Sequence, residues 1–232
     1  MDRRSYTLIE EYMLSCMQDS AHDKDHVYRV LYNAMIIAEK ESNVNYDVLI
    51  GACILHDIGR QEQFADPSVC HAEAGADKAF RFLLAQGFSK DYALQVQACI
   101  LTHRFRKNRK PESLESKILF DADKLDVVGA MGIARTLVYN GTLSEPLYSL
   151  LPDGSVSSGE NDTQPSFCHE YKFKLEKLYD HFYTETAARM ANQRKKITAD
   201  FYESLYREAS AAHEFGREAL ARKIQNSPSC SF

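Results

Sequence analysis

Residues 51–60, GACILHDIGR, place a histidine and an aspartate at the end of an apolar helical run. With Ala52 four residues and Cys53 three residues before it, His56 lies on the apolar side of a helix predicted over 45–58. Asp57 is turned about 100° around the same helix and can reach the edge of that side. A buried carboxylate without a partner is costly, so the doublet indicates a metal site.

Two more metal-type residues lie on apolar faces elsewhere in the chain. His26, in DKDHVYRV, precedes Val30 by one helical turn. Taken alone, it is better explained as a hydrogen-bonded core histidine, and it becomes a candidate ligand through the other metal-type residues. Asp123, in KILFDADKLDVVGAMG, has Leu119 and Val127 four residues to either side. Imidazole and carboxylate together suit Mn, Fe, Ni, Co or Zn.

Two neighbouring aspartates are alternatives to Asp123. Asp121 has Lys117 one turn before it and can be a solvated ion-pair member, so it is the fallback ligand. Asp126 lies close enough to orient a ligand or to touch substrate. We take Asp123 as the ligand because its helical neighbours are apolar.

The apolar period is helical almost throughout, and no run alternates with a period of two, which predicts an all-α fold. Asp23 is the expected N-cap of the second helix. The stretch 140–166 is rich in Gly, Ser, Pro, Asp and Asn and predicts a long loop or a lid. The expected helices are 6–17, 24–41, 45–58, 71–86, 90–104, one long segment from Pro111 to about Tyr139, 167–191 and 194–223.

The composition excludes several classes of protein. The 232 residues carry 28 Lys and Arg against 33 Asp and Glu, a net charge of −5, which gives no basic surface for long nucleic acid. There is no leader and no apolar run of about 18 residues, so no membrane association is expected. The six cysteines form no CxxC pair and are expected to be free thiols, as in a soluble cytoplasmic protein.

The ordered set of motifs resembles the HD-domain phosphohydrolases, in particular a bacterial subgroup of small all-helical members. A histidine, an adjacent His-Asp pair and a distant aspartate occur in that order. The similarity covers about residues 20–136, and the C-terminal segment 167–194 also looks like that subgroup. The matching stretches are DKDHVYRV, GACILHDIGR, HAEAGA, ILTHR and ILFDADKLDVVGAMGIAR.

The resemblance implies an orthogonal helical bundle with extra C-terminal helices. It also implies one divalent ion (Mn, Co, Ni, Fe, Mg or Zn) held by four residues: His26, His56, Asp57 and Asp123. Such an ion lowers the pKa of bound water and neutralises phosphate oxygens. In the two-metal members further histidines hold a second ion. His71 and His103 have the matching order, but their spacing departs from that pattern, so we expect a single tight ion.

Other residues are candidates for contact with phosphate or with the attacking water. His71 and His103 are candidates for both contacts, and Asp57 can also orient the water. Arg29, one turn after His26, Lys124, next to Asp123, and Arg104, next to His103, are candidate phosphate-binding cations. Arg29 and Lys124 can equally be solvated surface charges.

The expected domain organisation is an HD-type metal-binding domain over 1–139, the loop or lid over 140–166, C-terminal helices over 167–225 that pack on the same domain, and a tail over 226–232. The expected function is hydrolysis of a small phosphorylated metabolite, a nucleotide such as a nucleoside triphosphate. A non-catalytic nucleotide-binding regulatory module with the same metal site is the alternative, and a structural metal clip is a third. A homodimer through the last helices is possible.

Overall fold

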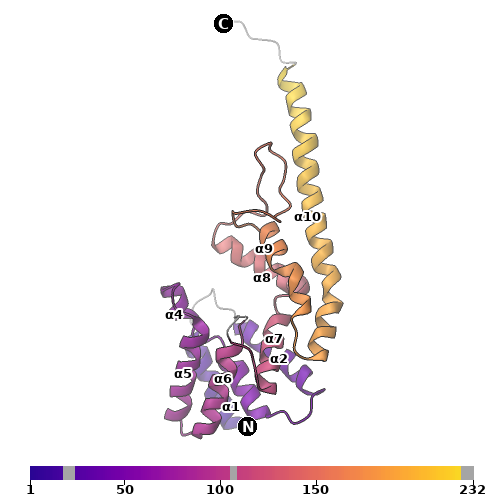
Figure 1. Cartoon of the computed structure of the whole chain (residues 1–232). Helices are drawn as coiled ribbons and strands as arrows, with labels where there is room; N and C mark the ends of the chain where they lie inside the picture. Colours follow the sequence, from indigo (N-terminus) through magenta and orange to yellow (C-terminus); the bar gives the residue numbers. More distant parts are fainter. Residues whose placement is uncertain (18–23, 105–108, 226–232) are drawn as a thin grey trace. The chain divides into compact units, whose positions relative to one another are not determined.

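The structure is a computed structural model that describes residues 1–17, 24–104 and 109–225. It is all-α, as the sequence predicts, and the described residues contain no β-strand. The helices are α1 (Arg3–Cys16), α2 (Lys24–Ala38), α3 (Tyr46–Leu55), α4 (Arg60–Ala65), α5 (His71–Ala85), α6 (Lys90–Thr102), α7 (Leu114–Leu125), α8 (Gly129–Thr142), α9 (Phe167–Phe173), the 3-10 helix η1 (Leu175–Asp180) and α10 (Glu185–Gln225). Figure 1 shows them along the chain.

The chain forms two compact units. The first contains Met1–Asp126 and Phe182–Met190, and the second contains Val127–His181 and the residues from Ala191 onward. The start of α10 therefore belongs to the first unit and the rest of that helix to the second. The predicted division into a domain over 1–139 and packed C-terminal helices stays a prediction.

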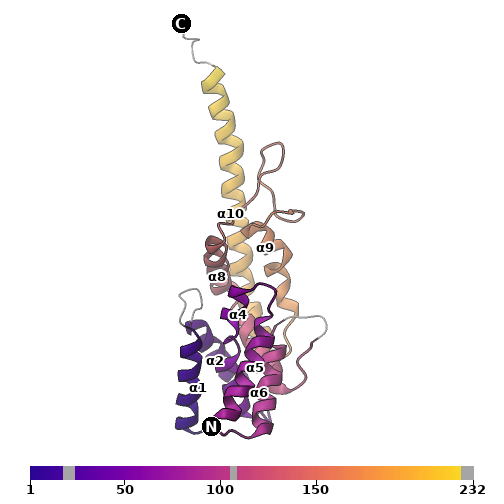
Figure 2. The same ribbon diagram turned by 90° about the vertical axis from the view of Figure 1, so that its left-hand side faces the viewer.

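Helix α3 is the centre of the first unit. It contacts α1, α2, α5, α6 and α7, while α5 and α6 pack against each other side by side (Figure 2). A short helix with apolar residues all round can be stable only when it is surrounded. Seven of its ten residues are buried: Val48, Leu49, Gly51, Ala52, Cys53, Ile54 and Leu55. The stretch that carries the His-Asp doublet is thus the core helix of the unit.

The segment predicted as one helix from Pro111 to about Tyr139 is instead two helices, α7 and α8. Asp126 caps the C-terminus of α7, and Val128 is extended with φ −122°. Gly129 then has φ +70°, a backbone conformation that other residues rarely adopt. The apolar residues have a helical period on both sides of Gly129, so the period alone could not predict that the helix ends there.

The C-terminal helices also differ from the prediction. The expected helix over 167–191 is split into α9, η1 and the start of α10, whereas the expected break between 191 and 194 does not exist. A new helix begins at Glu185 because Thr184 Oγ1 accepts the backbone N–H of Ala187 (3.3 Å). The expected tail and the expected cap Asp23 lie outside the described residues.

The predicted loop over 140–166 begins three residues late, because α8 extends to Thr142. Within the second unit the loop is held on α10: Arg217 Nη1 donates to the Asp153 carbonyl (2.9 Å), and Tyr148 Oη lies 3.2 Å from His213 Nε2. Figure 1 shows it running beside that helix. Its role as a lid stays a prediction.

Among the described residues, no helix has both the length and the apolar character needed to cross a membrane. The five described cysteines are free thiols. Cys53 and Cys99 are buried, as predicted, and so is Cys168. Cys230 lies outside the described residues.

Candidate metal centre

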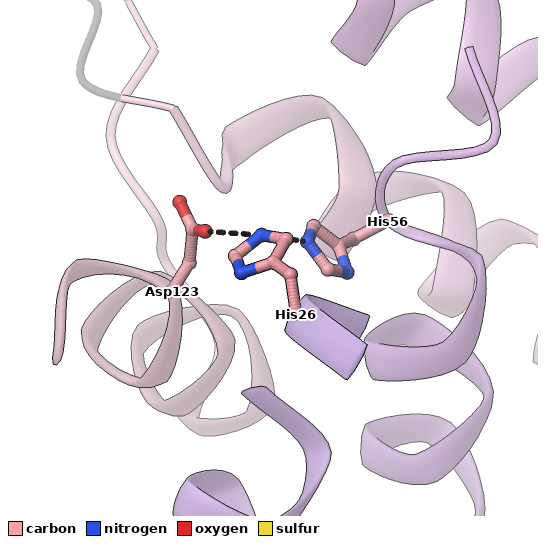
Figure 3. Close-up of side chains that lie close together, drawn as sticks. All are labelled: His26, His56 and Asp123. Atoms are coloured by element: carbon pink, nitrogen blue, oxygen red, sulfur yellow. Dashed lines mark hydrogen bonds and ion pairs between the residues drawn. The ribbon is translucent and has the colours of Figure 1, made fainter. Parts of the chain in front are cut away.

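Six side chains that the sequence analysis selected lie together in the first compact unit. His26 comes from α2, and His56 and His103 are the C-cap residues of α3 and α6. His71 is the first residue of α5, Asp57 follows His56, and Asp123 comes from the last turn of α7. Figure 3 shows His26 between His56 and Asp123. All four histidines and Asp57 are at most 4 % exposed, whereas the Asp123 side chain is 23 % exposed.

Asp57 is at the centre of this cluster, with its two oxygens facing different histidine pairs. Oδ2 lies 3.6 Å from His26 Nε2 and 3.7 Å from His56 Nε2. Oδ1 lies 3.4 Å from His71 Nε2 and 3.6 Å from His103 Nε2. Two sets of possible ligands result. The first is His26, His56 and Asp123, and the second is Asp57, His71 and His103.

Two of the histidines are oriented in the same way by the helices they end. His56 Nδ1 lies 2.7 Å from the Cys53 carbonyl, and His103 Nδ1 lies 2.6 Å from the Ile100 carbonyl, in both cases three residues earlier. The last carbonyls of a helix have no partner within it, so they are available as acceptors. Since a carbonyl only accepts, Nδ1 carries the proton in both rings and Nε2 presents its lone pair to the cluster.

His26 is oriented by the Asp126 carboxylate, which contacts the ring nitrogen that faces away from the cluster. Its Nδ1 lies 2.7 Å from Asp126 Oδ2, and Arg29 binds the same carboxylate through Nε (2.8 Å to Oδ1) and Nη2 (3.1 Å to Oδ2). This contact places the proton on Nδ1 and turns Nε2 toward Asp57 and Asp123. Asp126, which the sequence analysis placed near the site without a definite role, thus orients His26.

His71 is held by the turn and short helix that follow the His-Asp doublet. Its Nδ1 lies 2.5 Å from Gln63 Oε1 on α4 and 3.3 Å from Arg104 Nη1. The shorter contact, to an oxygen acceptor, favours a proton on Nδ1. A Cβ on Gly59 would lie 2.2 Å from the His71 carbonyl oxygen, so only glycine lets the turn approach α5 this closely.

The donor set fits a divalent metal. His26 Nε2 and His56 Nε2 are 3.3 Å apart, as are His71 Nε2 and His103 Nε2. When both rings of a pair are neutral and protonated on Nδ1, two lone pairs face each other, an arrangement that a cation stabilises. Asp57 Oδ1 is also buried without a well-aligned hydrogen bond from the described residues, although Arg60 Nε lies 3.0 Å away.

The pKa values follow from burial and from the charges in the cluster. Burial lowers the pKa of His26, but the adjacent carboxylates of Asp123 and Asp126 outweigh it and raise that pKa to about 9. Burial lowers the pKa of His56 to about 4. Burial, assisted by the charge of Arg60, lowers the pKa of His71 to about 2.

The pKa values of the two carboxyl groups in the cluster, Asp57 and Asp123, are lowered, although burial alone would raise them. Burial raises the pKa of a carboxyl group, but Arg60 and His56 hold the pKa of Asp57 well below its usual range. His26 lowers the pKa of Asp123 in the same way, again against burial. Both groups are therefore ionised at neutral pH and ready to bind a cation.

The fallback ligand Asp121 does not join the cluster. It was expected to be a solvated partner of Lys117, but it is fully buried. It accepts hydrogen bonds from Tyr183 N (2.9 Å), Thr184 N (2.7 Å) and Thr184 Oγ1 (2.7 Å). Asp121 therefore fixes the segment before α10, and Asp123 Oδ1 is the oxygen that lies 3.3 Å from His26 Nε2.

Of the cations that the sequence suggested, Arg104 lies beside His71, whereas Lys124 and Arg29 make other contacts. Lys124 is 8 % exposed, and its Nζ lies 4.3 Å from the Phe120 ring centroid. Arg29 binds Asp126, as described above. Arg60 and Gln63 were not predicted from the sequence, although Arg60 follows Asp57 at the three-residue spacing that brings helical side chains together.

The sequence model of the HD domain matches residues 24–128 of this chain. A Bacillus subtilis (strain 168) relative, the uncharacterized protein YpgQ, is 30 % identical over 192 residues, which is 81 % of this chain and 84 % of that protein. The structure of YpgQ in complex with ADP has a TM-score of 0.67 at 26 % identity, covering 88 % of this chain and 97 % of the other.

Two further solved structures are similar over most of the chain. A Lactobacillus plantarum protein has a TM-score of 0.71 at 28 % identity and covers 91 % of this chain and 99 % of its own. A predicted HD superfamily hydrolase from an uncultured Thermotogales bacterium has a TM-score of 0.56 at 30 % identity and covers 89 % and 92 %.

Proposed function

Because this chain belongs to the HD-domain family, we propose that it is a divalent-metal-dependent phosphohydrolase acting on a small phosphorylated metabolite. We propose a nucleotide as the substrate, specifically a nucleoside triphosphate that releases phosphate or pyrophosphate. The observation that carries this proposal is the convergence of four histidine Nε2 atoms and Asp123 around Asp57. The complex of YpgQ with ADP supports a nucleotide as the ligand class.

We assign His26, His56, Asp57 and Asp123 as the ligands of one tightly bound ion, which is Mn, Co, Ni, Fe, Mg or Zn. The charges favour this half of the cluster. Asp123 and Asp57 both face it, and the carboxylate of Asp126 stands behind His26. A divalent ion held there lowers the pKa of a bound water and neutralises phosphate oxygens.

We assign His71 and His103 to contact with phosphate or with the attacking water. Among the described residues, this half of the cluster has one carboxylate, Asp57, which it shares with the other half, and two guanidinium groups lie beside it. Arg60 Nε is 3.0 Å from Asp57 Oδ1, and Arg104 Nη1 is 3.3 Å from His71 Nδ1. Positive charge disfavours a second cation and favours a phosphate oxygen. A weaker second ion on the same residues is the competing assignment.

Three cations are candidates for stabilising the charge that develops on phosphate. Arg60 is the candidate that the geometry adds, because it contacts Asp57. Arg104 was already a candidate from its place after His103, and it contacts His71. Lys124 keeps its place as a candidate, adjacent in sequence to Asp123. Arg29 was expected to contact phosphate. Its two hydrogen bonds to Asp126 favour a positioning role instead, in which it holds the carboxylate that orients His26.

The cytoplasm fits this proposal, since the described cysteines are free thiols and a reducing compartment keeps them so. A homodimer through the C-terminal helices stays a prediction.

The test is a screen of the Mn-, Co- and Ni-loaded protein against a panel of nucleotides, with phosphate and pyrophosphate assayed separately. We expect turnover that requires the metal and is abolished in His56→Ala and Asp57→Ala. Circular dichroism of each variant checks that helicity is retained. Turnover that is unchanged in either metal-replete variant would refute the proposal.

Two other outcomes have their own meaning. Protection of the protein against heat by a nucleotide, with no product released on long incubation, would identify a binding module. Global unfolding on treatment with a chelator would identify a structural metal clip.

A further inference from the structure

The first compact unit contains a hollow that no side chain of the metal centre lines. Its volume is about 550 Å³, within the range of small-molecule sites. It is formed by the residues that follow α2, by the first turn of α7 and by residues 183–189 at the start of α10. These residues have no role in the proposed reaction.

Cationic side chains predominate in this hollow. Lys40, Lys117 and Arg189 line it, against two carboxylates, Glu41 and Glu185. Among the described residues neither lysine has an ion-pair partner, and Arg189 makes one hydrogen bond, from Nη2 to Thr186 Oγ1 (3.4 Å). The chain as a whole has a net charge of −5, so three cations around one hollow form a local positive region that favours an anionic ligand.

The backbone adds donors at the same place. Helix α10 has 41 residues, so the dipole at its N-terminus is fully developed. Thr184 Oγ1 accepts the N–H of Ala187, which leaves the N–H groups of Glu185 and Thr186 without an acceptor among the described residues. Both residues line the hollow. Free N–H groups at a helix start bind phosphate oxygens.

We propose that this hollow is a binding site, separate from the metal centre, for the phosphate group of a small phosphorylated molecule. Lys117 and Arg189 supply charge-assisted hydrogen bonds, and the N–H groups of Glu185 and Thr186 supply two more donors. The ring of Tyr183, 43 % exposed, lines the hollow and is available to stack on a base or sugar attached to that phosphate. Recognition rests on the phosphate, so both inorganic phosphate and a nucleoside monophosphate are ligands of the required chemistry.

The hollow is joined to the helix that carries Asp123. Tyr183 N and Thr184 N donate to Asp121, two residues before Asp123 on α7. A ligand at this site would therefore stabilise the segment 182–190, which Asp121 holds. Slower amide exchange in that segment is therefore the local signature of binding at this site.

The experiment follows hydrogen–deuterium exchange of the peptide 182–190 in full-length protein kept metal-free with a chelator. Inorganic phosphate and AMP are added separately. At ten times the dissociation constant, exchange through local opening should slow about tenfold. Protection by phosphate alone identifies the phosphate group as sufficient, and protection by AMP alone identifies a nucleotide site that uses Tyr183. Both results support the proposal.

The matched variants decide whether this hollow is the site. Lys117→Ala/Arg189→Ala should weaken binding by at least about tenfold. Arg81→Ala/Lys90→Ala removes the same charge from exposed positions outside the hollow and should leave binding unchanged. No protection by either ligand, or equal loss in both double variants, would overturn the proposal. Because the metal is absent and turnover is not read, this result is independent of the proposed hydrolase activity.

Discussion

Binding of a divalent metal should release about one proton per chain below pH 9, and that proton comes from His26. Asp123 and Asp126, acting against burial, raise the pKa of His26 to about 9, so the ring is doubly protonated at pH 7 in the metal-free protein. The proton on Nε2 lies between the ring and Asp123 Oδ1, where a metal would bind. His56 and His71, with pKa values of about 4 and about 2, have no extra proton to lose.

The size of the effect follows from that pKa. A metal must displace the proton, so its apparent affinity falls about tenfold for each pH unit below 9, or about 1.4 kcal/mol per unit. At pH 7 the affinity should be about 100-fold below its high-pH limit. The sign is definite: affinity rises as pH rises toward 9 and levels off above it.

Calorimetric titration with Mn²⁺ at about pH 6.5, in two buffers of different ionisation enthalpy, measures the number of protons released. We expect a value near one. Asp126→Asn is the control, because removing the carboxylate behind Nδ1 lowers the pKa of His26 and weakens the dependence on pH. Metal binding without proton release, or an affinity that is constant between about pH 6 and 8, would refute the assignment of His26 as a ligand.

Two pairs of variants test the structural assignments. Asp121→Ala should leave the N–H groups before α10 without an acceptor, which lowers the free energy of unfolding by about 2–4 kcal/mol and leaves the metal content unchanged. Asp123→Ala should instead lose the metal. Chemical denaturation and metal analysis of both variants test this, and an exchange of the two effects would contradict it. Gly59→Ala should lower the free energy of unfolding by about 1–3 kcal/mol, and with it the melting temperature, because the added Cβ would lie 2.2 Å from the His71 carbonyl oxygen. Gly141→Ala, whose Cβ meets nothing within 4 Å, should be neutral or stabilising, and an equal loss in both would refute the contact.

The sequence identified the apolar helix faces that carry His26, His56 and Asp123, and these polar residues that interrupt them. His56 could be placed because its neighbours at three and four residues are apolar, and the same reasoning separated Asp123 from Asp121. The hydrogen bonds of Asp121 could not be predicted, since its partners Tyr183 and Thr184 are about 60 residues away in the chain and donate through backbone N–H groups. Local spacing carries no information about such contacts.

The supporting contacts of the cluster were the hardest part to predict. Gln63 and Arg60 belong to α4, a helix of six residues without a buried side chain, so no apolar period marks it. The break between α7 and α8 depends on one glycine with φ +70°, inside a sequence that is helical on both sides. Helix α10 is continuous because residues 190–194 contain neither Gly nor Pro. The alternating charges on both sides of this stretch were interpreted as two separate helices.

The central claim is that the side chains around Asp57 form a metal centre, and the metal content of the purified protein tests it most directly. After loading with Mn²⁺ and exhaustive dialysis, elemental analysis should find one ion per chain, which is lost in His56→Ala and retained in His103→Ala. A second ion that is lost only in His103→Ala would mean that both ligand sets are filled. A chain that retains no ion, or that retains the same amount in His56→Ala as in the wild type, would contradict the account.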